Sequence, residues 1–361
     1  MKELIIGDLV AKVPIIQGGM AVGISLSGLA SAVAIAGGIG VIATAGIGHN
    51  ETDLKTNWNE VHNRVLRQEI RKAKAKSNGI IGINIMVALS NYADCVKTAI
   101  NEEADIIFSG AGLPLSLPEF LPEGNTKTKL VPIVSSGKAA GLIAKRWIEK
   151  YNYIPAAIVL EGPRAGGHLG FKKENIFDPK FELENLLPDV LAQIKPLEDK
   201  YNTAIPVIPG GGIYTGADIY KFMKMGAAGV QMATRFVGTF ECDASDEFKQ
   251  AYLNATKDDA IIIDSPLGMP GRAIRSQFLT DVSAGQKKPF NCPYHCIIPC
   301  KVKTAPYCIA HALCNAKEGN LLEGFAFAGE NVYRVNEIVH VKDLMDSLVA
   351  EYNKAEASDK A

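Results

Sequence analysis

Short apolar segments alternate with longer amphipathic segments over the first 232 residues of the chain. Each short segment is almost continuously apolar, which is typical of parallel strands buried on both faces. The amphipathic segments between them predict helices or helix-bearing connections. The predicted strands span residues 13–17, 38–43, 80–86, 105–108, 130–134, 156–160, 206–209 and 229–232. The longer predicted helices span residues 25–36, 52–76, 91–103, 138–150, 183–201 and 217–225.

Eight strand–helix units in about 240 residues predict an α/β fold, a closed (β/α)8 or TIM barrel. An open doubly wound sheet would place a glycine-rich loop between its first strand and the following helix. The glycines at 37, 38 and 40 precede a strand instead, so the barrel is favoured. Residues 241–325 lack the alternation and are predicted to form an inserted, mainly helical, cysteine-rich cap. Residues 1–240 would then be the barrel, completed by about 326–361.

Charge and composition exclude several classes of protein. The 361 residues include 38 basic and 39 acidic side chains, so no basic excess indicates nucleic-acid binding. The longest apolar stretch, residues 26–45, is interrupted by glycines and falls short of a membrane span. Charged residues near the start do not resemble a signal peptide. We therefore expect a cytoplasmic protein with no membrane or nucleic-acid partner.

Glycines and a threonine follow the last two predicted strands. Gly210, Gly211 and Gly212 come directly after the seventh strand, and Thr234 comes just after the eighth. Barrels of this type often bind phosphate in these two loops. Glycines allow backbone N–H groups to approach phosphate oxygens closely. The pattern therefore predicts a phosphate-bearing ligand, although three glycines can also serve only to turn a loop.

Six motifs occur in order along residues 13–236. They are PIIQGGMA at 14–21, AGGIG at 36–40, GINIM at 82–86, AGGHLG at 165–170, GGI at 211–213 and QMATRF at 231–236. In these motifs the chain resembles the nitronate monooxygenase family, formerly called 2-nitropropane dioxygenases, which includes flavin-dependent enoyl-ACP reductases. The FAG segment at 327–329 is also similar to that family.

The resemblance implies a barrel that binds FMN without a covalent bond. It places Gly18, Gly19 and Met20 along the flavin ring, and Asn84 at the ring or the ribityl chain. It assigns the phosphate to Gly211, Gly212, Ala233 and Thr234, with Ala233 standing where many members have glycine. Gly166, Gly167 and Gln231 lie in the same motifs and complete the predicted cofactor-binding set.

His168 is the predicted catalytic residue. It follows the sixth strand in a glycine-rich loop, and histidine suits proton transfer near neutral pH. The resemblance makes it a general base or a substrate-orienting donor beside the flavin; the alternative is a loop histidine bonded only to backbone. Arg164 stands where the family often has glutamate. We expect it either to attract an anionic substrate or to be solvated at the rim.

A run of cysteines lies in the predicted cap, with the spacing C-x3-C-x3-C-x7-C at Cys292, Cys296, Cys300 and Cys308. Four clustered thiols in a cytosolic chain indicate a metal rather than disulfides. Three interpretations stay open: a [4Fe–4S] cluster, zinc with help from His295 or His311, or unligated thiols. A cluster close to FMN would accept electrons from a ferredoxin-like donor. Cys95 and Cys242 are expected to be isolated structural thiols.

Three functional hypotheses follow. The first is an FMN-dependent oxidoreductase that oxidises alkyl nitronates (nitroalkanes) with O2. The second is an NAD(P)H-dependent FMN reductase of an enoyl thioester, and the third is a flavin and metal protein for electron transfer or redox sensing. Basic residues between 64 and 76 offer a docking site for an acyl carrier protein, or else a solvated helix face. A homodimer is a working assumption only.

Overall fold

Eight parallel strands close into a barrel, as predicted. The structure is a computed structural model, and it describes residues 1–125, 127–286, 288, 290–292 and 294–360. The strands follow one another around the barrel in the order β10-β11-β3-β4-β5-β6-β7-β8. Their bounds are β3 Ile15–Gln17, β4 Ile39–Ala43, β5 Ile80–Met86, β6 Ile106–Gly110, β7 Lys129–Val134, β8 Ile158–Glu161, β10 Val207–Gly210 and β11 Val230–Met232.

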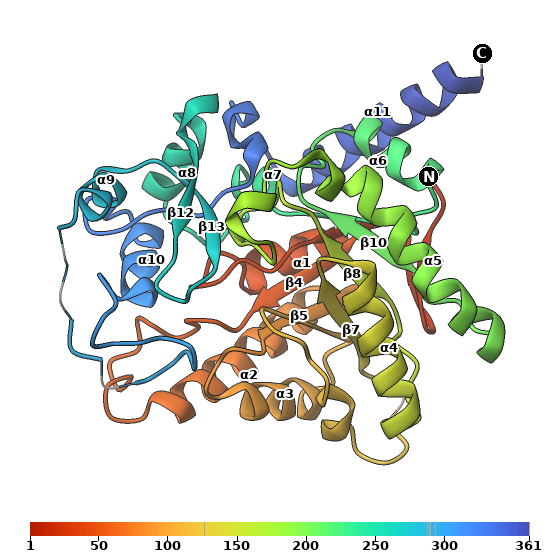
Figure 1. Cartoon of the computed structure of the whole chain (residues 1–361), viewed down its shortest axis with the longest axis horizontal. Helices are drawn as coiled ribbons and strands as arrows, with labels where there is room; N and C mark the ends of the chain where they lie inside the picture. Colours follow the sequence, from red (N-terminus) through yellow and green to blue (C-terminus); the bar gives the residue numbers. More distant parts are fainter. Residues whose placement is uncertain (126, 287, 289, 293, 361) are drawn as a thin grey trace.

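Helices surround the barrel between these strands (Figure 1). They are α1 Ser27–Ile35, α2 Trp58–Lys76, α3 Tyr92–Asn101, α4 Gly137–Tyr151, α5 Leu183–Tyr201 and α6 Gly216–Lys224, with a short 3-10 turn, Leu117–Phe120, between β6 and β7. The last helix, α11 Val341–Lys360, packs against α6 and α1. Among the described residues, no helix is both long and apolar enough to span a membrane.

The barrel interior is filled by apolar side chains from alternating strand positions, including Ile16, Val41, Phe108 and Val159, all nearly inaccessible to solvent. A hairpin that the sequence analysis did not anticipate, β1 Leu4–Ile6 and β2 Leu9–Ala11, packs into the same cluster. This packing leaves the C-terminal ends of the strands as the open side of the barrel.

The segment between the barrel and α11 lies beside that open side (Figure 1). Its described residues include the helices α8 Asp246–Leu253, α9 Gln277–Ser283 and α10 Ile309–Lys317, and the short α7 Thr234–Val237 precedes them. It also contains an unanticipated antiparallel hairpin, β12 Ala260–Asp264 and β13 Pro270–Ile274. The hairpin pairs with β9 Gly167–His168, which belongs to the loop after β8. The cap is therefore joined to the barrel through the predicted catalytic loop.

Candidate active site

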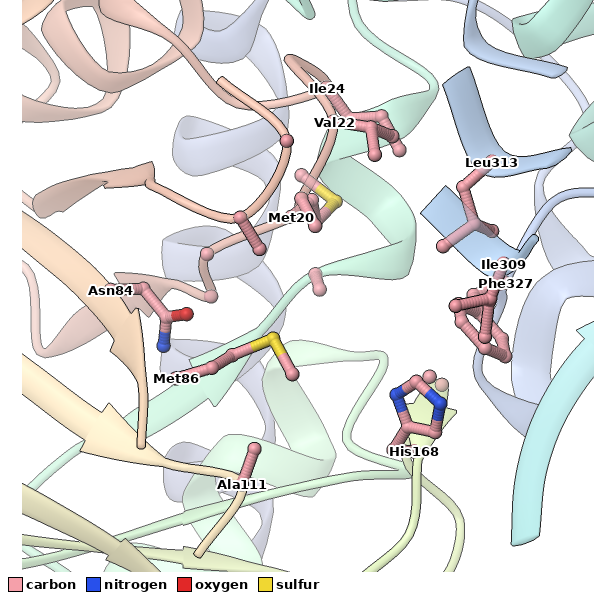
Figure 2. A pocket seen from close by; sticks show the side chains of 18 of the residues that line it. Met20, Val22, Ile24, Asn84, Met86, Ala111, His168, Ile309, Leu313 and Phe327 are labelled. Atoms are coloured by element: carbon pink, nitrogen blue, oxygen red, sulfur yellow. The ribbon is translucent and has the colours of Figure 1, made fainter. Parts of the chain in front are cut away.

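A cavity of about 980 Å³ lies between the barrel mouth and the cap. This volume is at the upper end of the range for small-molecule sites, roughly 300–1,000 Å³. All the residues predicted to bind the cofactor line it, as do His168 and Arg164. The cap closes the other side with Ile309, Leu313 and Phe327 (Figure 2). The structure thus brings together residues that are more than 300 positions apart in sequence.

Backbone without side chains forms one part of the wall, at Gly18 and Gly19 after β3. A Cβ atom on Gly19 would lie 2.4 Å from the Cβ of Asn84, so only glycine allows this close approach. The Gly18 N–H donates to the Met232 carbonyl oxygen at 2.8 Å, which joins the end of β3 to β11. Asn84 and Met86, at the end of β5, line the same cavity (Figure 2). The result is a stretch of bare backbone that a planar ring can approach closely.

The predicted phosphate loops are held together by residues 329–331. Gly211 and Gly212 have φ of 99° and 90°, a left-handed backbone that side chains rarely adopt. The Asn331 Nδ2 donates to the Gly212 carbonyl oxygen at 2.7 Å. The Gly329 N–H donates to the Thr234 Oγ1 at 3.2 Å, which leaves the threonine proton free to donate elsewhere. The sequence analysis did not single out Asn331; its neighbouring FAG motif was the available signal.

His168 lies on β9, opposite Gly271 of β13, with its ring edge-on to Phe327 at a centroid distance of 5.1 Å. Its Nε2 lies 2.8 Å from the Ser265 Oγ. The Ser265 Oγ also accepts the Leu267 N–H at 3.2 Å, so its own proton is available to the histidine. We therefore assign the imidazole proton to Nδ1, which faces the cavity in Figure 2.

Burial lowers the pKa of His168 to about 4, so the ring is neutral at physiological pH. A neutral ring can donate a hydrogen bond from one nitrogen without carrying charge. A pKa this low makes it a poor general base near neutrality. Of the two predicted roles, the substrate-orienting donor is the one this environment favours.

Glu161 is a cavity residue that sequence reasoning missed. It is the last residue of β8 and pairs in register with Gly210 of β10. Loss of solvation raises its pKa to about 7, so it changes charge in the physiological range. The available signal was an acidic residue at the carboxyl end of a buried strand, a position where barrel enzymes place functional groups.

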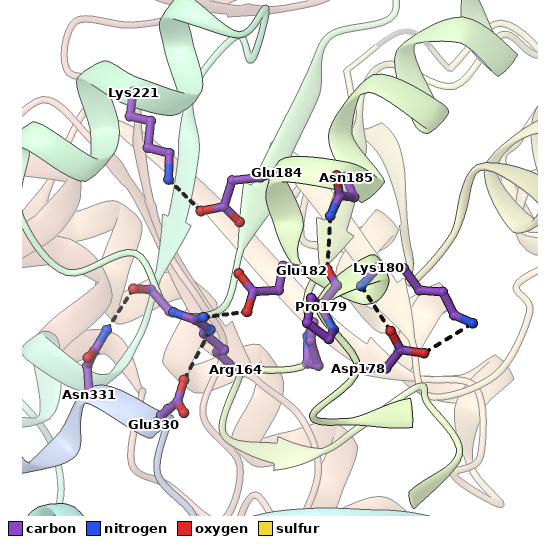
Figure 3. A network of polar contacts seen from close by, with 12 residues as sticks. Arg164, Asp178, Pro179, Lys180, Glu182, Glu184, Asn185, Lys221, Glu330 and Asn331 are labelled. Atoms are coloured by element: carbon purple, nitrogen blue, oxygen red, sulfur yellow. Dashed lines mark hydrogen bonds and ion pairs between the residues drawn. The ribbon is translucent and has the colours of Figure 1, made fainter. Parts of the chain in front are cut away.

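Arg164 lies at the rim of the cavity, where two carboxylates already pair with it (Figure 3). It contacts the Glu182 Oε1 at 2.6 Å and the Glu330 Oε2 at 3.2 Å. Its aliphatic stem adjoins Gly212, where a Cβ would lie 3.0 Å from the arginine Cβ. These pairs neutralise the guanidinium, so a role in attracting an anionic substrate stays a prediction and is not favoured by the geometry.

The four predicted metal-binding cysteines come together beside the main cavity. Cys292, Cys296, Cys300 and Cys308 line a small second cavity of about 20 Å³. All of these except Cys300 also line the main cavity. Among the residues that the structure describes, no three His, Cys, Asp or Glu side chains form a group that could hold a metal ion. The described residues thus show no preformed site for a single metal ion. Metal binding at these cysteines remains a prediction.

The basic segment of α2 is largely paired within the molecule. Arg64 contacts Glu51 and Asp53, both at 2.8 Å. Arg67 and Arg71 share one glutamate, Glu102. Lys72 pairs with Glu69, and Lys74 donates to the carbonyl oxygen of Glu102. These contacts favour a solvated helix face over a docking site for an acidic carrier protein.

Comparison with known proteins identifies related sequences. A family model described as nitronate monooxygenase matches residues 2–113 and 67–351. The chain is 27% identical over 274 residues to a Mycobacterium tuberculosis protein named (3aS,4S,5R,7aS)-5-hydroxy-7a-methyl-1-oxo-octahydro-1H-indene-4-carboxyl-CoA dehydrogenase. That match covers 76% of this chain but 66% of the relative, just under two thirds of its length. A probable nitronate monooxygenase from Staphylococcus haemolyticus is 26% identical, with 93% of both chains covered.

Solved structures show the same architecture. FabK from Thermotoga maritima superimposes with a TM-score of 0.75 at 26% identity, covering 97% of this chain and 96% of that one. Nitroalkane oxidase from Streptomyces ansochromogenes superimposes with a TM-score of 0.72, covering 96% of this chain and 97% of that one. At 21% identity the second likeness concerns the fold alone.

Proposed function

The chain belongs to the nitronate monooxygenase family of oxidoreductases, and from that membership we propose that it is an FMN-dependent enzyme that oxidises alkyl nitronates with O2. The observation that carries the proposal is the position of His168. Its neutral ring and the glycine backbone after β3 line the same cavity, on different parts of its wall.

The residues at the barrel mouth fit FMN. The side-chain-free backbone at Gly211 and Gly212, together with the Thr234 hydroxyl, forms a set of donors suited to a phosphate. Gly18 and Gly19 leave space where any side chain would meet Gln231 or Asn84. When bound there, FMN would supply the transfer of electrons from the substrate to O2.

The protein's own contribution is to orient the substrate and to exclude water. The His168 Nδ1–H would donate to a nitronate oxygen, holding the anionic head of the substrate without placing a second charge in the cavity. Ile309, Leu313 and Phe327 of the cap offer an apolar wall for the alkyl chain. Glu161 lines the same cavity, and with a pKa of about 7 its carboxyl can hold or release a proton there.

A second candidate is the NAD(P)H-dependent reduction of an enoyl thioester. The cap side of the cavity is apolar, at Ile309, Leu313 and Phe327, and such a wall also suits the chain of an acyl thioester. The structural likeness to FabK and the sequence likeness to a protein named as a CoA-ester dehydrogenase agree with this candidate. Either reaction would use the same cofactor site.

An anaerobic absorption titration of the purified flavoprotein separates the two. Loss of the flavin absorption band on adding an alkyl nitronate, without nicotinamide, supports the first proposal. Loss of the band with NADH or NADPH, and its return on adding an enoyl thioester, supports the second and overturns the first. A purified protein that neither retains nor rebinds FMN would overturn both.

A further inference from the structure

The cysteine-bearing segment between α9 and α10 is anchored on the barrel. The Ser90 N–H donates to the Cys296 carbonyl oxygen at 3.1 Å, and the Ile298 N–H donates to the Ala88 carbonyl oxygen at 2.9 Å. Leu89 and Ile297 form an antiparallel bridge between these two bonds. The anchoring loop directly follows β5, the strand that places Asn84 in the main cavity. The thiols are thus held at the mouth of the barrel, close to the cofactor end.

Four thiols, those of Cys292, Cys296, Cys300 and Cys308, line one small cavity in this segment. The remaining wall is almost entirely apolar, made by Phe290, Ile297, Val302, Ile309 and Ala310, with His295 as the other polar residue. All four cysteines are free thiols, so no disulfide accounts for their grouping. Each lies only partly exposed to solvent. An apolar pocket lined by sulfur has no evident structural purpose without an occupant.

The chain is shaped around this pocket at two positions. His295, between Cys292 and Cys296, has φ of 46°, a left-handed conformation that is uncommon for histidine. It turns the chain so that the cysteines on both sides line the same cavity. Cys308 is the N-cap residue of α10, where the first backbone N–H groups of the helix are available to a sulfur anion. Hydrogen bonds to cluster sulfurs are one means by which proteins hold and tune iron–sulfur centres.

We propose that Cys292, Cys296, Cys300 and Cys308 hold a [4Fe–4S] cluster. The four thiolates of such a cluster each bind a different iron, so they stand farther apart than ligands that share one ion. The four thiols line one cavity, as such a ligand set requires. Soft thiolate ligands without carboxylates select iron–sulfur clusters or zinc, and four thiolates are the usual ligand set of a [4Fe–4S] cluster.

A cluster at this position would border the main cavity, because Cys292, Cys296 and Cys308 line both spaces. It would accept one electron from a donor of the ferredoxin class and pass one electron towards the flavin end of the cavity, with no proton required. This role rests on the proposed FMN site, whereas the presence of the cluster does not.

The test measures iron, acid-labile sulfide, zinc and FMN per chain in protein purified without oxygen and, separately, reconstituted with iron and sulfide. We expect about four irons and four sulfides per chain and an electron paramagnetic resonance signal after reduction with dithionite. Cys300→Ser should lose this iron while keeping FMN, because Cys300 lines only the small cavity. Cys314→Ser is the matched control, since Cys314 lines the main cavity but not the small one, and should keep its iron.

Several outcomes would overturn the cluster. The proposal is wrong if the protein binds FMN but contains no iron after reconstitution, or contains one zinc per chain instead. It is also wrong if Cys300→Ser retains the full amount of iron. If Cys300→Ser loses FMN and unfolds early, Cys292→Ser is measured by the same criteria. Iron-containing protein that does not bind FMN would overturn the proposed flavin function and leave the cluster standing.

Discussion

The Ser265 hydroxyl lies 2.8 Å from the Nε2 of His168, although 97 residues separate them in the sequence. Ser265 is buried in the turn between β12 and β13, and β13 is the strand that pairs with His168. The cap therefore both covers the cavity and determines which imidazole nitrogen carries the proton. Ser265 acts through the histidine and is a positioning residue.

Ser265→Ala should lower kcat by roughly tenfold, in line with the effect of losing a partner that orients a histidine. The imidazole would lose the donor that keeps its proton on the cavity side. Steady-state kinetics and FMN content would be measured together, because the rate should fall while bound FMN is unchanged. Ser265→Thr retains a hydroxyl and should recover most of the rate. Equal kcat in the alanine variant and the parent would contradict the assignment.

Burial of neutral His168 should make stability dependent on pH. The folded pKa of about 4 lies below the unfolded value of about 6.5, so the unfolded chain binds the proton more tightly. The contribution is fully present above pH 6.5 and is lost as the pH falls towards 4. A shift of this size corresponds to on the order of 3 kcal/mol when complete.

Urea unfolding of the parent and of His168→Gln, at pH 7 and pH 5, would measure this loss. The parent should lose more stability than the variant between these two values. Comparison with the variant cancels the contributions of His49 and His62, whose pKa values are also lowered by burial. Parallel losses in the two proteins would show that His168 is not desolvated.

Titration of the Glu161 carboxyl should make the rate of the reaction depend on pH near pH 7. Burial raises its pKa to about 7, so its carboxyl changes from mainly neutral to mainly charged between pH 6 and pH 8. The pH dependence of kcat/KM should show an inflection there that is absent in Glu161→Gln, which keeps the size of the side chain. Arg164→Lys at the rim is a control that should keep the inflection. If the inflection is still present in Glu161→Gln, it arises from the titration of another group.

The barrel could be predicted from the sequence because each strand is an apolar run of local residues. Contacts between distant segments could not. The hairpin of β12 and β13 was missed because its strands lie in a region without regular alternation, and Ser265 was missed with it. Asp243 shows the same limit: its carboxylate accepts the N–H groups of Leu26, Gly28 and Leu29 at the start of α1, more than 200 residues earlier.

The sequence predicted which glycines line the cavity, but it did not reveal why glycine is needed at each position. Glycine-rich motifs indicated the cofactor loops, and the structure places the glycines predicted to bind the cofactor on the cavity wall, namely Gly18, Gly19, Gly166, Gly167, Gly211 and Gly212. The glycines at 37, 38 and 40, from another of the motifs, do not line it. That Gly19 lies against Asn84, rather than merely turning the chain, became evident only from the packing. Arg164 was assessed from its charge alone, whereas its acidic partners Glu182 and Glu330 come from two other segments.

Gly19→Ala should weaken FMN binding by more than tenfold. The new Cβ would lie 2.4 Å from the Cβ of Asn84 and 2.9 Å from its Cγ, so either the backbone or Asn84 must move. The Gly19 backbone and Asn84 both border the wall proposed for the flavin ring, so a shift of either would disturb the binding of the ring.

Gly141→Ala in α4 is the control, because its Cβ would only approach the end of the Gln193 side chain at 3.3 Å. That control should bind FMN normally and gain about 0.5–1 kcal/mol in stability from its helical position. FMN affinity measured by fluorescence titration of the FMN-free proteins compares the two, and unchanged affinity in Gly19→Ala would place the flavin ring elsewhere in the cavity.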